Sequence, residues 1–292
     1  MNTIESVLKQ NYPNWEHIIV DDISTDNTWE VINEYCKQDK RIKGVKRNRD
    51  PKGAQTCRNL GLLNSKGNYI IFLDSDDLIL PFCLSQRLAY IKAYPDKDLL
   101  VFPKKPIPGY TRNILLRQFL SYHLPCQIMD STWNRKYLNK LGGFNLKLKR
   151  FQDAELHIRA LLDEELNFKF FADHKIDNIY NINITKSEGG NVIVVYGSYR
   201  IFIREVSKLL VDKGKDKLLI HIRFYLRSWL IHYHTKSVSS FTRKLVSDFR
   251  EIGIISFFLN VLILINIKVL NVLSLKGKWL SKTIYYTAFI IK

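Results

Sequence analysis

The sequence lacks the marks of several protein classes. Its four cysteines lie singly, with no Cys-x-x-Cys pair and no histidine at a ligand-like spacing, which argues against a zinc site or a disulfide framework and favours a reducing compartment. The first ten residues hold no apolar segment of the kind found in secretory signal peptides, so we expect a cytoplasmic protein. No helix-turn-helix, RNA-recognition or zinc pattern occurs, so nucleic acid is not an expected partner.

Acidic residues are scarce beside basic ones. The 292 residues include 45 Lys and Arg but 28 Asp and Glu, a formal charge of +17. Such an excess calls for a polyanionic partner or surface, such as nucleic acid, anionic lipid or a phosphorylated substrate. Residues 199–292 hold 17 basic and 5 acidic residues, so +12 of the charge lies there. Hydrophobic residues, at 46%, are as frequent as in ordinary folded proteins with a sizeable core.

The first two thirds of the chain alternate between strand and helix patterns. Strand patterns cover residues 16–20, 42–46 and 68–73, and helical patterns cover 3–10, 29–35, 53–64 and a segment that begins at Pro81. Ser24, Thr25, Asp26 and Asn27 are helix-capping residue types and precede the second helix. Alternation of this kind predicts an α/β sheet with helices on both faces.

The character of the sequence changes past residue 195. Residues 196–250 carry long helical patterns rich in Lys, Arg, Tyr and Trp. We therefore expect two regions, an α/β domain over residues 1–195 and a basic helical region over residues 196–292.

Residues 252–273 are strongly apolar and are followed by three lysines. Asn260, Asn266 and Lys268 interrupt the apolar run, and a lysine inside hydrocarbon is costly. The pattern favours a helix lying in a membrane interface over one that spans the bilayer, and a buried core helix is the alternative. Flanking basic residues would bind anionic lipid.

Two predicted strands end in carboxylates. The first ends in Asp21-Asp22, and the other is followed by acids at 74, 76 and 77. Ligands of open α/β sheets bind at the carboxyl ends of strands, and like charges there need a cation or hydrogen-bond donors nearby. A single cluster is explained equally well by solvated loop acids. Two clusters at equivalent strand ends favour a shared metal and nucleotide site.

Four segments resemble the signatures of family 2 glycosyltransferases with the GT-A fold. Residues 18–28 (IIVDDISTDNT) resemble VDDGSTDNT, and residues 53–61 (GAQTCRNLG) resemble G-x-x-x-A-R-N-x-G. Residues 72–77 (FLDSDD) match the FLDxDD strand end with its D-x-D motif, and residues 141–153 are similar to the GGF…ED region, with Gln in place of Glu before the last Asp. The four segments stand in family order, and the resemblance covers about residues 1–185. It implies a Rossmann-like GT-A nucleotide-sugar transferase domain with a C-terminal helical extension.

The resemblance assigns a role to five residues. Asp22 would hydrogen-bond the base of the nucleotide and Asp74 its ribose, while Arg58 would reach the nucleotide. Asp76 would hold Mn²⁺ or Mg²⁺, which would bridge both phosphates and stabilise the charge that grows on the leaving diphosphate. Asp153 would deprotonate the acceptor hydroxyl in a single, inverting displacement.

Some of these residues have simpler interpretations. Asp153 opens a helical run, where a carboxylate interacts favourably with the helix dipole. Arg58 also suits a solvated helix position, and Glu155 is a weaker candidate base on another face of the helix. Phosphatases of the haloacid dehalogenase type also place D-x-D after a strand. The residues that follow D-x-D here, Asp77 and Leu78, do not fit that class. A phosphatase would also leave the upstream segments, residues 18–28 and 53–61, unexplained.

The resemblance also implies the partners. The donor would be a UDP or GDP sugar, and the acceptor a glycan or a polyprenyl-linked sugar in bacterial surface polysaccharide assembly. With its basic, apolar C-terminal region, the protein would lie peripherally or monotopically on the inner face of the plasma membrane. Family members usually open with an apolar strand that ends in a P-x-Y-N-like segment, and this sequence begins in the following helix. The alternative is therefore a truncated, catalytically inactive relative that acts as a membrane-associated binding protein.

Overall fold

The computed structural model describes residues 2–105, 109–171, 173–180, 192–233 and 236–256, together with 260, 261, 263–265 and 267. The chain forms two compact units, one of residues 1–111 and 125–187, the other of residues 112–124 and 188–292. Half of the apolar run over residues 252–273, including all of 268–273, lies outside the described residues. The domain division near residue 195 stays a prediction.

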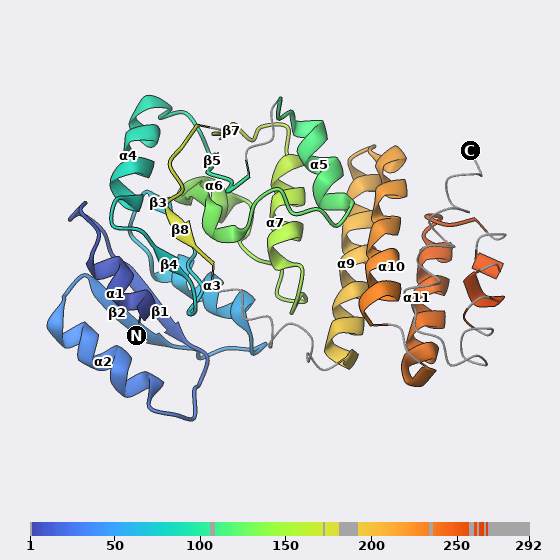
Figure 1. The fold of residues 1–292 in the computed structure, drawn as a ribbon, viewed down its shortest axis with the longest axis horizontal. Helices are drawn as coiled ribbons and strands as arrows, with labels where there is room; N and C mark the ends of the chain where they lie inside the picture. Colours follow the sequence, from blue (N-terminus) through green and yellow to red (C-terminus); the bar gives the residue numbers. More distant parts are fainter. Residues whose placement is uncertain are drawn as a thin grey trace. The chain divides into compact units, whose positions relative to one another are not determined.

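The first unit begins with the alternation that the sequence predicts (Figure 1). The elements are helix α1 (Asn2–Leu8), strand β1 (His17–Asp21), helix α2 (Thr28–Gln38), strand β2 (Ile42–Lys46) and helix α3 (Ala54–Asn64). β1 and β2 are parallel, with His17 opposite Ile42 and Asp21 opposite Lys46. At the start of α2 the Thr28 amide donates to the Asp26 carboxylate at 3.0 Å, whereas the N-cap residue, Asn27, makes no side-chain capping bond.

A second sheet contains four short strands in the order β3-β6-β5-β7. Their bounds are β3 Tyr69–Ile70, β5 Leu99–Val101, β6 Ser131–Asn134 and β7 Phe168–Phe170. β6 is antiparallel to both of its neighbours, whereas β5 and β7 are parallel. A separate antiparallel pair joins β4 (Leu78–Ile79) to β8 (Asn178–Ile179), and the helices of this half are α4 (Cys83–Ala93), α6 (Arg135–Lys140) and α7 (Gln152–Leu161). The predicted α/β class is confirmed, with antiparallel pairs added to the parallel ones.

Several predicted boundaries differ from the structure, two of them for a reason that the hydrogen bonds show. The strand pattern over residues 68–73 yields a strand of only two residues, β3, because no described backbone pairs with residues 71–73. Helix α4 begins at Cys83 rather than at Pro81. The Pro81 carbonyl instead accepts a hydrogen bond from the Asn11 amide, which ties the turn before α4 to the end of α1.

The core of this unit lies around β5. Leu99, Leu100, Val101 and Phe102 are each at most 1% exposed. Leu100 and Phe102 pack with Phe171, and the Phe102 and Phe171 rings stack with centroids 5.0 Å apart. An all-apolar run buried on both faces is typical of a central strand.

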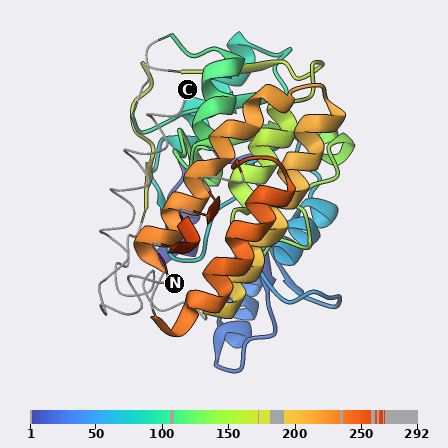
Figure 2. The same cartoon turned by 90° about the vertical axis from the view of Figure 1, so that its right-hand side faces the viewer.

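The second unit is helical (Figure 2). It contains α5 (Arg112–Leu120), α9 (Val192–Asp212), α10 (Leu219–His232) and α11 (Ser239–Glu251), and α10 packs against the other three. Asp248 on α11 is buried and pairs with two arginines of α9, Arg200 and Arg204. No helix within the described residues is both long and apolar enough to cross a membrane.

Candidate functional site

A cavity of about 1380 Å³ in the first unit runs along β1 and residues 69–73 and reaches the carboxyl ends of both. Four of the five predicted site residues line it: Asp22, Arg58, Asp74 and Asp76. They come from the end of β1, from α3 and from the loop after residue 73. The structure therefore brings both acidic clusters to one cavity, as expected for ligand sites of open α/β sheets.

Asp22 is held by an arginine that follows the neighbouring strand. The Arg47 guanidinium donates to the Asp22 carboxylate and also to Asp50 at 3.2 Å, and the Arg47 side chain is only 7% exposed. Asp22 also faces the thiol of Cys57. Burial, and then the Asp22 charge, raise the pKa of Cys57 to about 11, so the thiol stays protonated at neutral pH. Asp22 thus has its charge balanced before any ligand binds.

Arg58 connects two of the predicted motifs. Its Nη2 donates to Asp74 Oδ1 at 2.6 Å, and its Nη1 donates to Gln152 Oε1 at 2.8 Å and to Asp153 Oδ1 at 3.4 Å. Burial alone would lower the pKa of Arg58, but the Asp153 and Asp74 charges outweigh it and raise that pKa. The side chain is 14% exposed, so this is a largely desolvated bridge rather than a solvated helix residue.

The next residue of α3 holds the GGF segment. Asn59 Nδ2 donates to the Phe144 carbonyl at 2.9 Å, and Asn59 Oδ1 accepts from the Phe144 amide at 2.8 Å. Gly143 has φ +66°, and a Cβ there would lie 2.5 Å from Asn59 Oδ1, so the close approach requires glycine. The Phe144 ring packs edge-on against Phe72, with centroids 4.9 Å apart. Two adjacent residues of α3 therefore hold the other motifs: Arg58 contacts Asp74 and Asp153, and Asn59 holds the GGF segment.

Asp153 lies in the first turn of α7, with its side chain 27% exposed. Desolvation raises its pKa above the ordinary value, although the Arg58 charge opposes this. His157, one turn further on, is bonded through Nδ1 to the Asp153 carbonyl at 2.7 Å and through Nε2 to Ser131 Oγ at 2.8 Å. The other candidate base, Glu155, is buried and pairs with Arg159 at 2.8 Å. The environment of Asp153 therefore suits a base better than that of Glu155.

Asp76 is the carboxylate predicted to hold a cation. It is exposed in the cavity and forms no hydrogen bond or ion pair with any described residue. Within the described part of the chain, no three His, Cys, Asp or Glu side chains cluster so as to hold a metal ion. Mg²⁺ and Mn²⁺ accept oxygen ligands and are commonly bound by one or two carboxylates with substrate phosphates and water. A single free carboxylate fits that chemistry.

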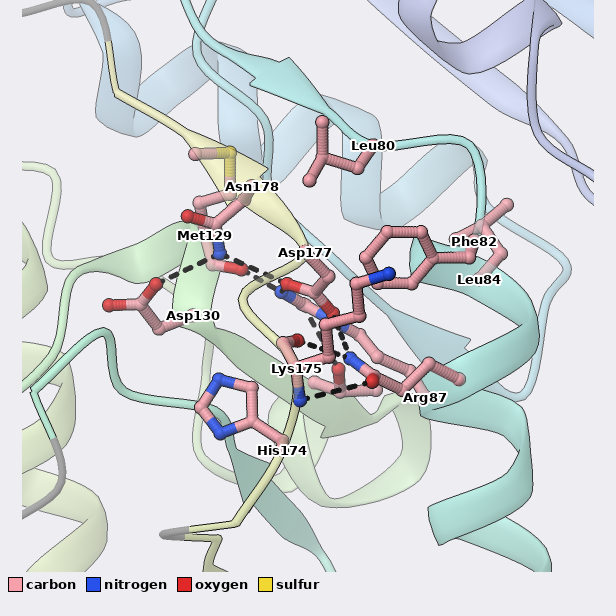
Figure 3. Close-up of polar contacts among 12 residues, drawn as sticks. Leu80, Phe82, Leu84, Arg87, Met129, Asp130, His174, Lys175, Asp177 and Asn178 are labelled. Atoms are coloured by element: carbon pink, nitrogen blue, oxygen red, sulfur yellow. Dashed lines mark hydrogen bonds and ion pairs between the residues drawn. The ribbon is translucent and has the colours of Figure 1, made fainter.

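A buried ion pair lies behind the cavity (Figure 3). Arg87 on α4 donates from Nε and Nη2 to the two carboxylate oxygens of Asp177, both at 2.8 Å, and both side chains are 0% exposed. Arg87 Nη1 also donates to the Met129 carbonyl at 2.8 Å. Asn178, the first residue of β8, donates to Asp130 and to Asp177. This network joins α4 to β8 and to the segment before β6, and Arg87 lines the cavity.

Sequence reasoning missed Arg47, Asn59, Arg87 and His157. For two of them a signal existed: Arg47 follows a predicted strand directly, and Asn59 stands beside Arg58 in the quoted motif. For Arg87 and its partner Asp177 there was none, because 90 residues separate them.

Comparison with known proteins agrees with the resemblance. The family model described as "Glycosyl transferase family 2" matches residues 2–210. UDP-Glc:alpha-D-GlcNAc-diphosphoundecaprenol beta-1,3-glucosyltransferase WfaP of Escherichia coli is 41% identical over 109 residues, which cover 34% of this chain and 42% of that protein. The putative teichuronic acid biosynthesis glycosyltransferase TuaG of Bacillus subtilis is 47% identical over 76 residues, or 26% of this chain and 30% of that protein. The chain thus matches less than half the length of either relative.

Among solved structures, the complex of S. aureus TarS 1-349 with UDP-GlcNAc has a similar fold. The TM-score is 0.65 at 18% sequence identity, and the match covers 92% of this chain and 83% of that one. The likeness confirms the predicted fold class, a mixed α/β GT-A domain with a helical C-terminal part.

Proposed function

The chain belongs to glycosyl transferase family 2, and from that membership we propose that it is an inverting glycosyltransferase. It moves a sugar from a nucleoside diphosphate sugar to a glycan or polyprenyl-linked acceptor during assembly of a bacterial surface polysaccharide. The observation that carries the proposal is the Arg58 bridge, which joins a carboxylate of the D-x-D segment, Asp74, to the candidate base, Asp153, beside one cavity. The two relatives, WfaP and TuaG, support the polysaccharide setting by the activities for which they are named.

The donor's nucleoside would lie between the two acidic strand ends. Asp22 accepts hydrogen bonds from the N–H groups of the base, and Arg47 holds that carboxylate in position. Asp74 accepts from the ribose hydroxyls, while Arg58 fixes its position. The solved TarS complex contains UDP-GlcNAc, which makes a UDP sugar a reasonable first ligand to test.

Asp76 would hold the divalent cation, Mn²⁺ or Mg²⁺, together with the donor's phosphate oxygens. When bound, that ion supplies Lewis-acid stabilisation of the negative charge that grows on the diphosphate. Arg58 also lines the cavity and adds a fixed positive charge, since its own pKa is raised.

Asp153 takes the proton of the acceptor hydroxyl. As that proton moves to the carboxylate, the hydroxyl oxygen forms the new bond to the anomeric carbon, and the bond to the diphosphate breaks with its electron pair on the leaving oxygen. Attack from the face opposite the diphosphate inverts the anomeric centre. A base with a pKa raised above that of an ordinary aspartate accepts the proton more readily, so burial of Asp153 serves the reaction.

The acceptor is proposed to be carried at a membrane. The C-terminal region holds most of the positive charge, and its α9 and α10 expose apolar side chains such as Ile193, Val211 and Ile220, which are 60%, 56% and 44% exposed. Basic charge beside apolar side chains suits an anionic membrane surface. The similar enzyme WfaP is named for a diphosphoundecaprenol-linked acceptor. We expect the protein to co-sediment with anionic vesicles at low salt, but not at high salt and not with neutral vesicles. Equal sedimentation with anionic and neutral vesicles would contradict binding through the positive charge of the C-terminal region.

Calorimetric titration with UDP and with GDP, each with and without Mn²⁺, tests the donor site. We expect metal-dependent binding of one nucleotide and a loss of at least about tenfold in affinity in Asp76→Ala. Glu164→Ala is the matched control, because it removes an exposed carboxylate outside the cavity. A folded chain that binds neither nucleotide would contradict the proposal and favour the second candidate, a catalytically inactive relative that binds membranes.

A further inference from the structure

The segment between the GGF segment and Asp153 carries positive charge and no acid. Residues 145–151, which we call the basic loop, read NLKLKRF, and no Asp or Glu occurs from residue 141 to residue 152. Lys147 and Lys149 are exposed, and Arg150 is partly buried. Three cations within four residues repel one another, so the arrangement becomes favourable when an anion lies among them.

The basic loop is fixed to the rest of the first unit. Just before it, Asn59 bonds both the amide and the carbonyl of Phe144. Near its end, Gln152 Nε2 donates to the Lys149 carbonyl at 3.1 Å. Between these points the Leu148 side chain is 0% exposed. Because the backbone is held before a ligand binds, binding by the loop's side chains costs less conformational entropy.

The last residue of the basic loop is strained. Phe151 has φ +63°, in the left-handed region that a bulky side chain rarely adopts. Such a conformation persists only where the surrounding structure fixes it. The residue leads directly into α7, so the basic loop and Asp153 in the first turn of that helix are held close together in the chain.

Gln152 connects the basic loop to the reacting groups. Its Oε1 accepts from Arg58 Nη1 at 2.8 Å, and Asp153 is the next residue. Lys149 precedes Asp153 by four residues, so their Cα atoms are at most about 15 Å apart. The Lys149 side chain forms no hydrogen bond or ion pair with any residue that the structure describes. An acceptor whose hydroxyl meets Asp153 therefore has this cation nearby.

We infer that the basic loop binds the diphosphate of the acceptor, next to the sugar whose hydroxyl Asp153 deprotonates. The inference rests on the proposed function and decides between its two acceptors. A glycan without phosphate gives the cations no partner, whereas a sugar joined to a polyprenyl chain through diphosphate carries negative charge beside the reacting ring. Lysine binds phosphate as a point charge. The donor's diphosphate is assigned to the cation at Asp76 and to Arg58, which leaves the basic loop for a second anion.

Calorimetric titration with farnesyl diphosphate tests the inference, with farnesol as the uncharged counterpart. EDTA is present, so that the diphosphate does not bind through a divalent cation at Asp76. We expect the parent chain to bind the diphosphate and not the alcohol. Lys147→Gln combined with Lys149→Gln should lose at least about tenfold in affinity, whereas Lys149→Arg, which keeps the charge, should bind like the parent.

The matched control removes the same charge elsewhere in the first unit. Lys37→Gln combined with Lys40→Gln replaces two exposed lysines near the end of α2 and should keep the affinity for farnesyl diphosphate within about twofold. Equal affinity of the parent for farnesyl diphosphate and farnesol would overturn the inference. Equal losses in the basic-loop and control double variants would also overturn it, because the effect would then be one of net charge.

Two further titrations identify which phosphate the basic loop binds. We expect the basic-loop double variant to bind UDP with Mn²⁺, and to co-sediment with phosphatidylglycerol vesicles, as the parent does. A tenfold loss of UDP affinity would assign the loop to the donor, and a loss of vesicle binding alone would assign it to lipid headgroups, and either result would overturn the inference. Binding of farnesyl diphosphate by a chain that binds no nucleotide would contradict the proposed donor site and leave the basic loop supported.

Discussion

Arg58 and Asp74 lie 16 residues apart and meet at 2.6 Å, and the same guanidinium reaches Asp153 at 3.4 Å. The bridge needs the planar fork of arginine, because a lysine ammonium cannot reach both carboxylates and Gln152 at once. We expect Arg58→Lys to lower kcat/KM for sugar transfer by about 100-fold. Arg41→Lys, which changes an arginine outside the cavity, should stay within about twofold. Equal losses in the two variants would contradict a specific role for the bridge.

Ile23 adopts the left-handed conformation, with φ +61°, and its side chain is 51% exposed. A β-branched residue is strained there, whereas glycine is not. Ile23→Gly should therefore be more stable than Ile23→Ala by about 1 kcal/mol, since alanine keeps the Cβ that causes the strain. Urea unfolding of the two variants measures the difference. A Gly variant no more stable than the Ala variant would show that the turn is not strained.

Local patterns predicted the first part of the fold well. Strand β2 has the predicted bounds, and α3 begins within one residue of the prediction, because apolar periodicity and turn residues are local properties. The length of the strand at residues 68–73 was overestimated because strand pairing is not a local property. The apolar run is suited to a buried strand, but a strand exists only where another backbone pairs with it. That pairing depends on distant parts of the chain.

The candidate site was predictable as a set of residues but not as a network. Asp22, Arg58, Asp74 and Asp76 line one cavity because they follow strand ends or lie on the helix beside them. The contact of Asp22 with Arg47 depends on how β1 pairs with β2, and the contact of Arg58 with Asp153 depends on how α3 and α7 pack. The roles in donor and acceptor binding remain predictions, which the titration and kinetic experiments test.

The Arg87 and Asp177 side chains are both 0% exposed, so removing one partner leaves an uncompensated buried charge. We expect Arg87→Met to lower the free energy of unfolding by about 3–5 kcal/mol. Arg87→Met with Asp177→Leu should recover most of that loss, because both desolvated charges are then gone. Chemical denaturation of both single variants and the double variant gives the coupling energy. A double variant as unstable as the sum of the single variants would contradict a direct ion pair.

His157 makes stability depend on pH. Burial lowers its pKa from 6.5 to about 4, so the folded state stays neutral where the unfolded state takes up a proton. The contribution is complete above pH 6.5 and is lost as the pH falls toward 4, at most about 3 kcal/mol. His17 behaves the same way, with a pKa lowered to about 4 by burial, whereas the raised pKa of Asp153 acts in the opposite direction above pH 3.8.

Because two histidines share that window, His157→Gln should reduce the pH slope of the unfolding free energy there without abolishing it. Glutamine retains a donor and an acceptor for the Asp153 carbonyl and Ser131. The expected change is about one proton, or 1.4 kcal/mol per pH unit, between pH 5 and 6. Replacing His123, whose side chain is exposed, is the matched control and should leave the slope unchanged. An unaltered slope in His157→Gln would mean that His157 titrates alike in the folded and unfolded states, and the neutral, buried imidazole behind Asp153 would have to be abandoned.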